Sequence, residues 1–320
     1  MALISFKLVM VVGIIMGVYS LLAIGMNMHW GDTGLLNFAH AGFFAVGAYT
    51  SAILTTPVAE TGLLANRVVG FDFPIFVGMI AATALAAGAG VLFGITSVRL
   101  EGDYLAIVTL AGAEILRLLI SNEAWLTSGE QTLKNIPRPF ESSVSPVMSY
   151  DAFYLGFVAL FVAAAYLLFR HLANSPFGRV LHAVREDEDV PKALGKDTAR
   201  FKLKSFGIGA GLAGLAGSLW AHYVFAIQPT MFLPNLTFSV WAMVIIGGAG
   251  SYLGAIVGAV LITAIRQITR FLPGDIPLGN ELPFLRLIII GVLLIVVLYY
   301  RPYGLMGDKE RAMAGIGGGE

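Results

Sequence analysis

The sequence predicts an all-α protein, a polytopic transmembrane helical bundle of about nine spans, some of them broken or re-entrant. Two observations predict this class. Of the 320 residues, 57% are hydrophobic and only 12% are charged, about half the charged share of a soluble domain. The hydrophobic residues also gather in runs, many of them about 20 residues long, which is the length of a helix that crosses a bilayer.

The first two spans are separated by a polar interruption. Residues 8–28 measure about 31 Å as a helix, enough to cross the hydrocarbon. They are longer than the apolar core of a signal peptide and no cleavage site follows, so we expect a retained span. Residues 31–40 are polar and glycine-rich and lead into a second apolar run. This pattern favours a broken helix that lines a protein-enclosed cavity, although a short loop between helices also fits.

The third and fourth spans follow at residues 74–96 and 104–120. The third is rich in Ala and Gly, which lets helices approach closely. The fourth contains Glu114 and Arg117, one helical turn apart. A charge at mid-membrane costs up to about 3 kcal/mol, so a pair facing the bundle interior is the cheapest arrangement. A structural ion pair near the outer interface and a role in a transport path both fit.

The most charged segment of the chain comes after the fifth span, residues 152–169. Residues 170–204 contain eight Lys or Arg residues and a run of four acidic residues. Basic loops stay on the cytoplasmic side, so we expect the N-terminus outside and the C-terminus inside. Two short helices are predicted within the segment, one starting at Ser175 and Pro176 and one ending at Gly195. Such a loop offers a surface that a partner protein can bind.

The last four spans are predicted at residues 203–224, 236–248, 252–267 and 283–300. The first of these contains letters that match a dinucleotide-binding fingerprint. No strand precedes them and no acidic residue follows, so a face of small packing residues is the better interpretation. The glycine run after the seventh span echoes the interrupted segment at residues 31–40. Paired interruptions in the two halves of a transporter indicate the substrate path.

Several kinds of chemistry are missing. The chain has no cysteine, which excludes disulfides and thiolate metal sites. His182 and Glu186 are four residues apart, but a solvated helix face is the better interpretation, and we expect no metal site. Phosphate-binding loops, nucleophile elbows and zinc-protease motifs are absent from the sequence. We therefore expect no catalytic residue and no enzyme activity, and zero net charge gives no reason to expect nucleic acid.

Four stretches stand out together. They are GLLNFAHAGFFAVGAY at 34–49, VRLEGDYLAIVTLAGAEILR at 98–117, GRVLHAVREDEDVPKALGKDTARFKLKSFGIGAGLAGLAG at 178–217, and IGGAGSYLGAIVG at 246–258. In this order along the chain they resemble the LivM-type permease subunits of branched-chain amino-acid ABC importers. The resemblance covers nearly all of residues 31–304.

The resemblance implies a permease domain over residues 1–306, with a cytoplasmic coupling loop at 170–204 and a flexible cytoplasmic tail at 307–320. It implies a multi-pass protein of the bacterial cytoplasmic (inner) membrane. The implied partners are a LivH-like second permease subunit, two LivG/LivF-like ABC ATPase subunits, a soluble substrate-binding protein and membrane lipid. ATP and Mg²⁺ then belong to the ATPases, and this chain binds no cofactor.

The resemblance also implies which residues couple the permease to the ATPases. These are Arg185, Glu186, Asp187, Glu188, Ala193 and Gly195. We expect the broken segments to line the translocation path, through Asn37, His40, Gly47, Gly247, Gly248 and Gly250. One departure concerns the loop after the fourth span, where the family's Thr-Gly-Gly turn reads Thr127, Ser128, Gly129. If that loop receives the binding protein or the substrate, substrate choice differs.

The expected function is ATP-driven import of branched-chain or other hydrophobic amino acids. An importer of urea or short-chain amides is the nearest alternative, because selectivity in such systems resides largely in the binding protein. A secondary transporter without ATPases is a different class. It should show ion-binding carboxylates near the midplane, where Glu114 is the strongest candidate.

Overall fold

The computed structural model describes residues 2–57, 69–97, 100, 102–141, 150–270 and 282–307. Within these ranges the chain is a bundle of helices, with an isolated antiparallel β-bridge between Leu133 and Ile227. Each of the nine predicted spans is helical, which confirms the predicted class. The nine are α1 (Ala2–Asn27), α2 (His40–Thr55), α3 (Ile75–Ser97), α4 (Gly102–Asn122), α6 (Tyr150–Asn174), α9 (Thr198–Val224), α10 (Pro234–Gly247), α11 (Tyr252–Arg270) and α12 (Leu282–Tyr300).

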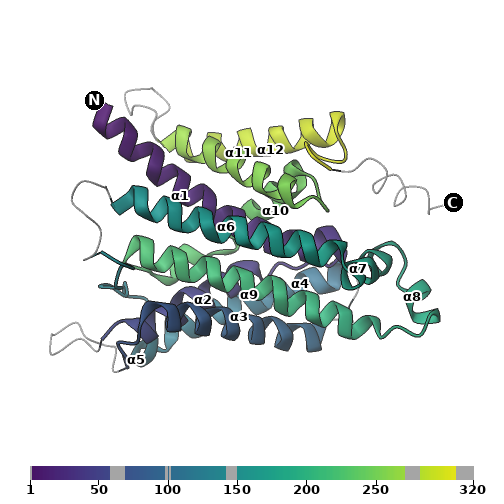
Figure 1. The fold of residues 1–320 in the computed structure, drawn as a ribbon, viewed down its shortest axis with the longest axis horizontal. Coiled ribbons are helices and arrows are strands. Elements are labelled where there is room, and N and C mark those ends of the chain that lie inside the picture. Colours follow the sequence, from purple (N-terminus) through teal and green to yellow (C-terminus); the bar gives the residue numbers. More distant parts are fainter. Residues whose placement is uncertain are drawn as a thin grey trace.

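Shorter helical segments lie between them. They are η1 (Met28–Asp32), α5 (Ala124–Thr127), α7 (Pro176–Glu186), α8 (Asp189–Ala193) and η2 (Pro229–Phe232). The long helices lie side by side, and α7 and α8 project from one end of the bundle (Figure 1). Helices α1 and α6 lead toward that end, whereas α9 leads away from it. The start of α1 and the charged segment therefore lie at opposite ends, as the charge pattern predicts.

Five segments of the described chain are long and apolar enough to cross a membrane by themselves: Lys7–Asp32, Ile75–Thr96, Gly102–Asn122, Tyr150–Asn174 and Pro229–Gly247. Helices α2 and α10 have only 16 and 14 residues, or about 24 and 21 Å. Each is therefore too short to cross the hydrocarbon alone. Helix α10 reaches spanning length together with η2, and α2 is preceded by the irregular residues 33–39.

The segments that interrupt the helices before α2 and before α10 enter the bundle in opposite orientations. Residues 33–39 follow α1 and precede α2, and residues 225–233, which include η2, follow α9 and precede α10. Because α1 and α9 run in opposite directions, the breaks enter the bundle from opposite ends. The helices that follow the two short helices are related in the same way: α3, after α2, packs on α9, and α11, after α10, packs on α1. Long helix, break and short helix therefore occur twice in opposite orientations.

The second break differs from the expectation. The glycine run at 247–250 predicted it, but that run forms the turn between α10 and α11. The break lies before α10, where Phe225 ends α9 in the left-handed conformation, with φ +48°. Pro229 and Pro234 then stop regular helix from resuming earlier, because proline lacks the N–H that an interior helical position needs.

Helix α9 is the centre of the bundle, and its glycines let α2 approach. A Cβ on Gly47 would lie 2.1 Å from Gly214 O, and a Cβ on Gly217 would lie 2.1 Å from Phe44 O. Both distances are far below van der Waals contact, so the two backbones touch. The interpretation of the Gly-rich run as a packing face is confirmed.

Candidate functional site: a charged loop tied to the broken spans

The charged segment folds as the sequence predicts. Ser175 is the N-cap of α7, and its Oγ accepts a hydrogen bond from Gly178 N at 3.4 Å. Pro176 occupies the first turn, where its missing N–H costs nothing. The second helix, α8, ends before Gly195, whose φ is +74°, and Lys196 N donates to Pro191 O at 2.9 Å. The segment therefore forms a pair of short helices that begin and end at the predicted residues.

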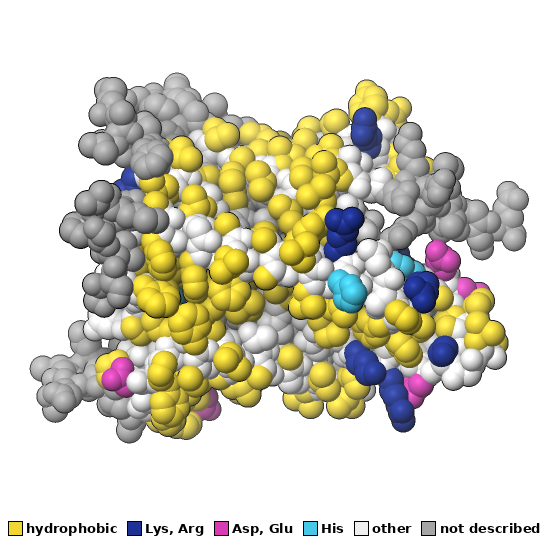
Figure 2. All heavy atoms as spheres, in the orientation of Figure 1, with side chains coloured by type: hydrophobic (Ala, Val, Ile, Leu, Met, Phe, Trp, Pro, Cys, Tyr) yellow, Lys and Arg dark blue, Asp and Glu magenta, His cyan; other side chains and the backbone are white. Residues whose placement is uncertain are grey.

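The two short helices present different faces. Leu181 and Val184 of α7 are buried, whereas Val190 and Leu194 at α8 are 53% and 75% exposed. On the face drawn in Figure 2, hydrophobic side chains cover the long helices and charged side chains gather at the end of α7 and α8. Exposed apolar side chains among charges are typical of a surface that binds another protein.

The structure divides the six predicted coupling residues into two groups. Glu186, Asp187, Ala193 and Gly195 are exposed. Arg185, which is also exposed, and the half-buried Glu188 make contacts within the chain. The first four, together with the apolar pair Val190 and Leu194, form an outward surface, here called the α7–α8 surface.

Glu188 ties the start of α8 to α9. One carboxylate oxygen accepts from Thr198 Oγ1 at 2.7 Å and the other accepts from Lys202 Nζ. Burial raises the pKa of Glu188, but the hydrogen bonds from Lys202 and Thr198 outweigh it and hold the pKa below the ordinary value of 4.5. The ion pair therefore fixes the position of α8 on the bundle.

Asp32 ties α7 to two further helices. The Asp32 side chain is 1% exposed and lies at the end of η1. Its Oδ1 accepts from His182 Nε2 on α7 at 3.2 Å, and its Oδ2 accepts from Tyr252 Oη on α11. Beside it, Arg185 Nη1 donates to Gly31 O. A displacement of α7 would therefore carry the end of α1 and the start of α11 with it.

The first break begins directly at this junction. Helix α1 widens into the π-helix η1, and Gly34 then takes φ +74° against the side chain of Arg185. The freed N–H groups are satisfied by other helices: Phe38 N donates to Thr109 Oγ1 and Ala41 N donates to Thr237 Oγ1, both at 2.9 Å. Irregular backbone at membrane depth is tolerated only with such internal partners.

Buried polar side chains surround the break. Asn37 Nδ2 donates to His29 Nδ1 at 2.9 Å, and His29 Nε2 donates to Ser205 O at 3.1 Å. His40 Nε2 donates to Leu22 O at 2.9 Å. The residues predicted to line the path, Asn37 and His40, are thus brought together with His29, which the sequence analysis missed. Each side chain is buried within the single chain.

The predicted glycines of the path lie elsewhere. Gly47 is at the contact of α2 with α9, and Gly247 is at the contact of α10 with α11. Gly248 and Gly250 have φ of +115° and +89°, which only glycine adopts readily. Gly250 N donates to Asn27 Oδ1 at 2.9 Å, so the turn between α10 and α11 abuts the end of α1, next to the α7 junction.

Two charged pairs lie farther from this junction. Arg117 Nε donates to Glu114 on α4 at 2.9 Å, as the spacing predicts.

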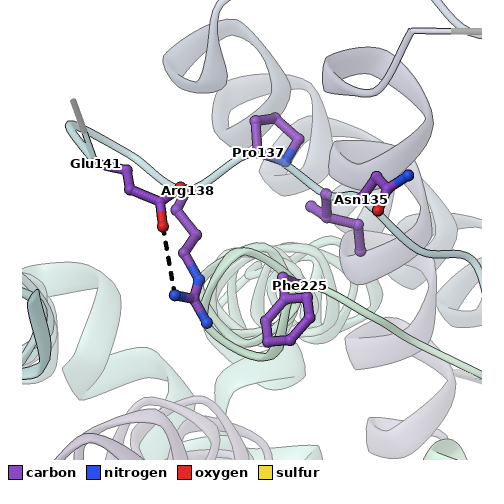
Figure 3. Close-up of a pocket in the computed structure, with 6 residues that line it drawn as sticks. Asn135, Pro137, Arg138, Glu141 and Phe225 are labelled. Carbon is purple, nitrogen blue, oxygen red and sulfur yellow. Dashed lines mark hydrogen bonds and ion pairs between the residues drawn. The ribbon is translucent and has the colours of Figure 1, made fainter.

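At the opposite end of the bundle from α7, a cavity of about 370 Å³ opens beside Arg138. Figure 3 shows the Arg138 guanidinium directed between Glu141 and the ring of Phe225, 4.6 Å from the ring centroid. The cavity is lined by Asn135, Ile136, Pro137, Arg138, Glu141 and Phe225.

Sequence reasoning missed the residues that connect these parts. Asp32 and Tyr252 are 220 positions apart, and no local pattern links them. An acid directly after an apolar span, within residues 31–34, was the available signal for Asp32. Leu194 carried a signal too, since an apolar residue within a charged loop needs a partner when it is not buried.

Comparison with known proteins identifies the family. The family model described as the permease component of the branched-chain amino acid transport system matches residues 9–298. The chain belongs to this permease family. It is 34% identical over 310 residues to the high-affinity branched-chain amino acid transport system permease protein LivM of Escherichia coli (strain K12), covering 90% of this chain and 68% of the relative.

Two further relatives agree with this assignment. A probable branched-chain amino acid transport permease protein LivM of Methanocaldococcus jannaschii is 28% identical over 334 residues, covering 95% of both chains. The permease protein LivH of Escherichia coli (strain K12) is 24% identical over 304 residues, covering 91% of this chain and 92% of LivH. No solved structure matches significantly. The chain is therefore a LivM-type permease and a multi-pass membrane protein.

Proposed function

We propose that this chain is one of two permease subunits of an ATP-driven importer for branched-chain or other hydrophobic amino acids. A LivH-like second permease, two ABC ATPases and a soluble binding protein complete the importer in the bacterial cytoplasmic (inner) membrane. ATP and Mg²⁺ bind to the ATPases, and this chain carries no catalytic group. The observation that supports the proposal best is the α7–α8 surface, rigid, charged and apolar at once, on a chain of the permease family.

The mechanism follows from the contacts of α7. ATPase closure would move α7 and α8, and Glu188 would carry the movement of α8 to the start of α9. Asp32 would then transmit the movement to the end of α1 and the start of α11. Both helices adjoin a broken span. The movement therefore reaches the irregular segments, whose rearrangement costs less free energy than that of an intact helix. Alternating access of this kind needs two discrete arrangements of packed helices.

The nearest alternative substrate is urea or a short-chain amide. Neutral buried groups such as Asn37 and the two His residues of the first break do not discriminate by charge. A binding protein that recognises leucine would favour the amino acid, and one that recognises urea would favour the alternative.

The proposal is tested by copurification of the ATPases with this chain. Glu186→Lys reverses an exposed charge of the α7–α8 surface, and Lys134→Glu reverses an exposed charge elsewhere. We expect the wild type and Lys134→Glu to retain the ATPases, and Glu186→Lys to lose most of them. Equal retention in all three chains would remove the α7–α8 surface from the interface. Absence of ATPase from the wild type, with solute movement down an ion gradient, would refute the importer.

A further inference from the structure

Helix α4 carries the Glu114–Arg117 pair within the membrane. By length, Glu114 lies about 18 Å from the start of α4 and about 12 Å from its end, whereas Arg117 lies about 8 Å from that end and near Glu130 of the following loop. The side chains of Glu114 and Arg117 are 39% and 18% exposed. The Glu114 carboxylate is therefore neither fully buried in the chain nor at a helix end.

Exposure to lipid would make this position costly. A charge at mid-membrane is costly, and charged residues in spans accordingly face protein or a water-filled cavity. The exposed faces of α3 and α6 agree with the rule. Helix α3 has no charged residue, and α6 has charges only near its ends, at Asp151 and Arg170.

The charges belong to a stripe along one side of α4. Leu110, Glu114, Arg117 and Ser121 are spaced four, three and four residues apart, so they share one side of the helix, and each is half-buried. The stripe flanks the side of α4 that packs on the rest of the bundle, where Gly42 lies against Ala113 and Gly112 lies against Phe93.

We propose that the Glu114–Arg117 side of α4 is the interface with the second permease subunit, a different chain of the same family. A protein helix with polar groups can satisfy the half-exposed charges, which lipid cannot. The occupant is argued from the relatives as well, because Escherichia coli (strain K12) has both LivM and LivH in a high-affinity branched-chain amino acid transport system. The inference rests on the proposed function, since it requires a second permease.

The absence of cysteine permits a clean labelling test in the full complex. Leu110→Cys places a nitroxide one turn from Glu114 on the same side of α4, at a half-buried position. Phe161→Cys on α6, also half-buried, is the matched control. In lipid nanodiscs we expect the label at 110 to be several-fold less accessible to dissolved oxygen than the label at 161. Equal accessibility would place α4 in lipid and overturn the inference.

A photocrosslinker on the same cysteine identifies the occupant. A benzophenone at residue 110 should form an adduct with the second permease subunit. Adducts with lipid alone, or with a second copy of this chain, would overturn the assignment. The ATPases are measured in the same preparation. If they are present while residue 110 is exposed to lipid, only this inference fails; if they are absent, the proposed function fails.

Charge substitutions test the ion pair itself. Glu114→Gln leaves Arg117 without its carboxylate and should lower recovery of the second permease about tenfold or more. The swapped variant, Glu114→Arg with Arg117→Glu, keeps a pair and should recover more of the partner than Glu114→Gln does. The matched control is Glu141→Gln, which removes the corresponding partner of Arg138 at three-residue spacing. Equal recovery in Glu114→Gln and Glu141→Gln would contradict the proposal.

Discussion

Replacing Leu194 by Ala should weaken ATPase binding without weakening the fold. The Leu194 side chain is 75% exposed, so truncation removes almost no contact within the chain. Burying a leucine side chain against a partner is worth about 1.5–3 kcal/mol. Three quarters of that, less the part that alanine retains, gives about 1–2 kcal/mol, or about a 5- to 30-fold weaker Kd.

The assay is titration of purified ATPase subunits onto the permease complex in nanodiscs, together with a thermal melt. Leu160→Ala on α6 is the matched control, because Leu160 is also exposed, at 65%, but lies on a membrane span. We expect Leu194→Ala alone to shift the Kd and neither variant to lower the Tm by more than a degree or so. An unchanged Kd for Leu194→Ala would refute the assignment of α8 as a docking helix.

Three further predictions concern the interior. Glu188 has a lowered pKa, so its ion pair with Lys202 stabilises the fold at pH values above the ordinary pKa of 4.5. This stabilisation is lost as pH falls through the lowered pKa. The Tm difference between wild type and Glu188→Gln should therefore shrink over that acid range and stay constant near neutrality. Asp32→Asn removes one charged acceptor from a buried pair of hydrogen bonds and should lower the free energy of unfolding by about 1–3 kcal/mol. Transport should fall more than substrate-independent ATP hydrolysis does. Equal losses of transport and ATP hydrolysis would contradict a transmitting role for Asp32. Gly47→Ala should lower the Tm by several degrees because its Cβ would meet Gly214 at 2.1 Å, whereas Gly88→Ala, which meets nothing within 4 Å, should not.

Much of the fold was predictable because membrane helices are specified locally. Length and hydropathy placed a helix in each of the nine predicted spans, and capping chemistry placed both short helices. Ser175 with Pro176 marked the start of α7, and Gly195 marked the end of α8. These signals act within a few residues and need no tertiary context.

The junctions between distant segments were not predictable in the same way. His182 meets Asp32 across 150 positions, and the contact depends on how α7 folds back on the bundle. The second break was also misplaced. Its cause is the left-handed Phe225, and an aromatic residue gives no local signal for that conformation, whereas the glycine run at 247–250 does.

Side-chain direction separated the coupling residues in a manner that the sequence could not. Arg185 and Glu186 are adjacent in sequence and both exposed, but the Arg185 guanidinium reaches back to Gly31. Adjacent helical positions point about 100° apart, and which one faces the bundle depends on its docking.

Uptake of labelled leucine into proteoliposomes is the most direct test of the account. The vesicles contain the complete complex, with binding protein outside and ATP inside, where the α7–α8 surface faces the ATP. The account predicts uptake that requires ATP and falls when Glu186→Lys separates the ATPases from the permease. Uptake that persists without ATP and follows an imposed proton or sodium gradient would contradict it.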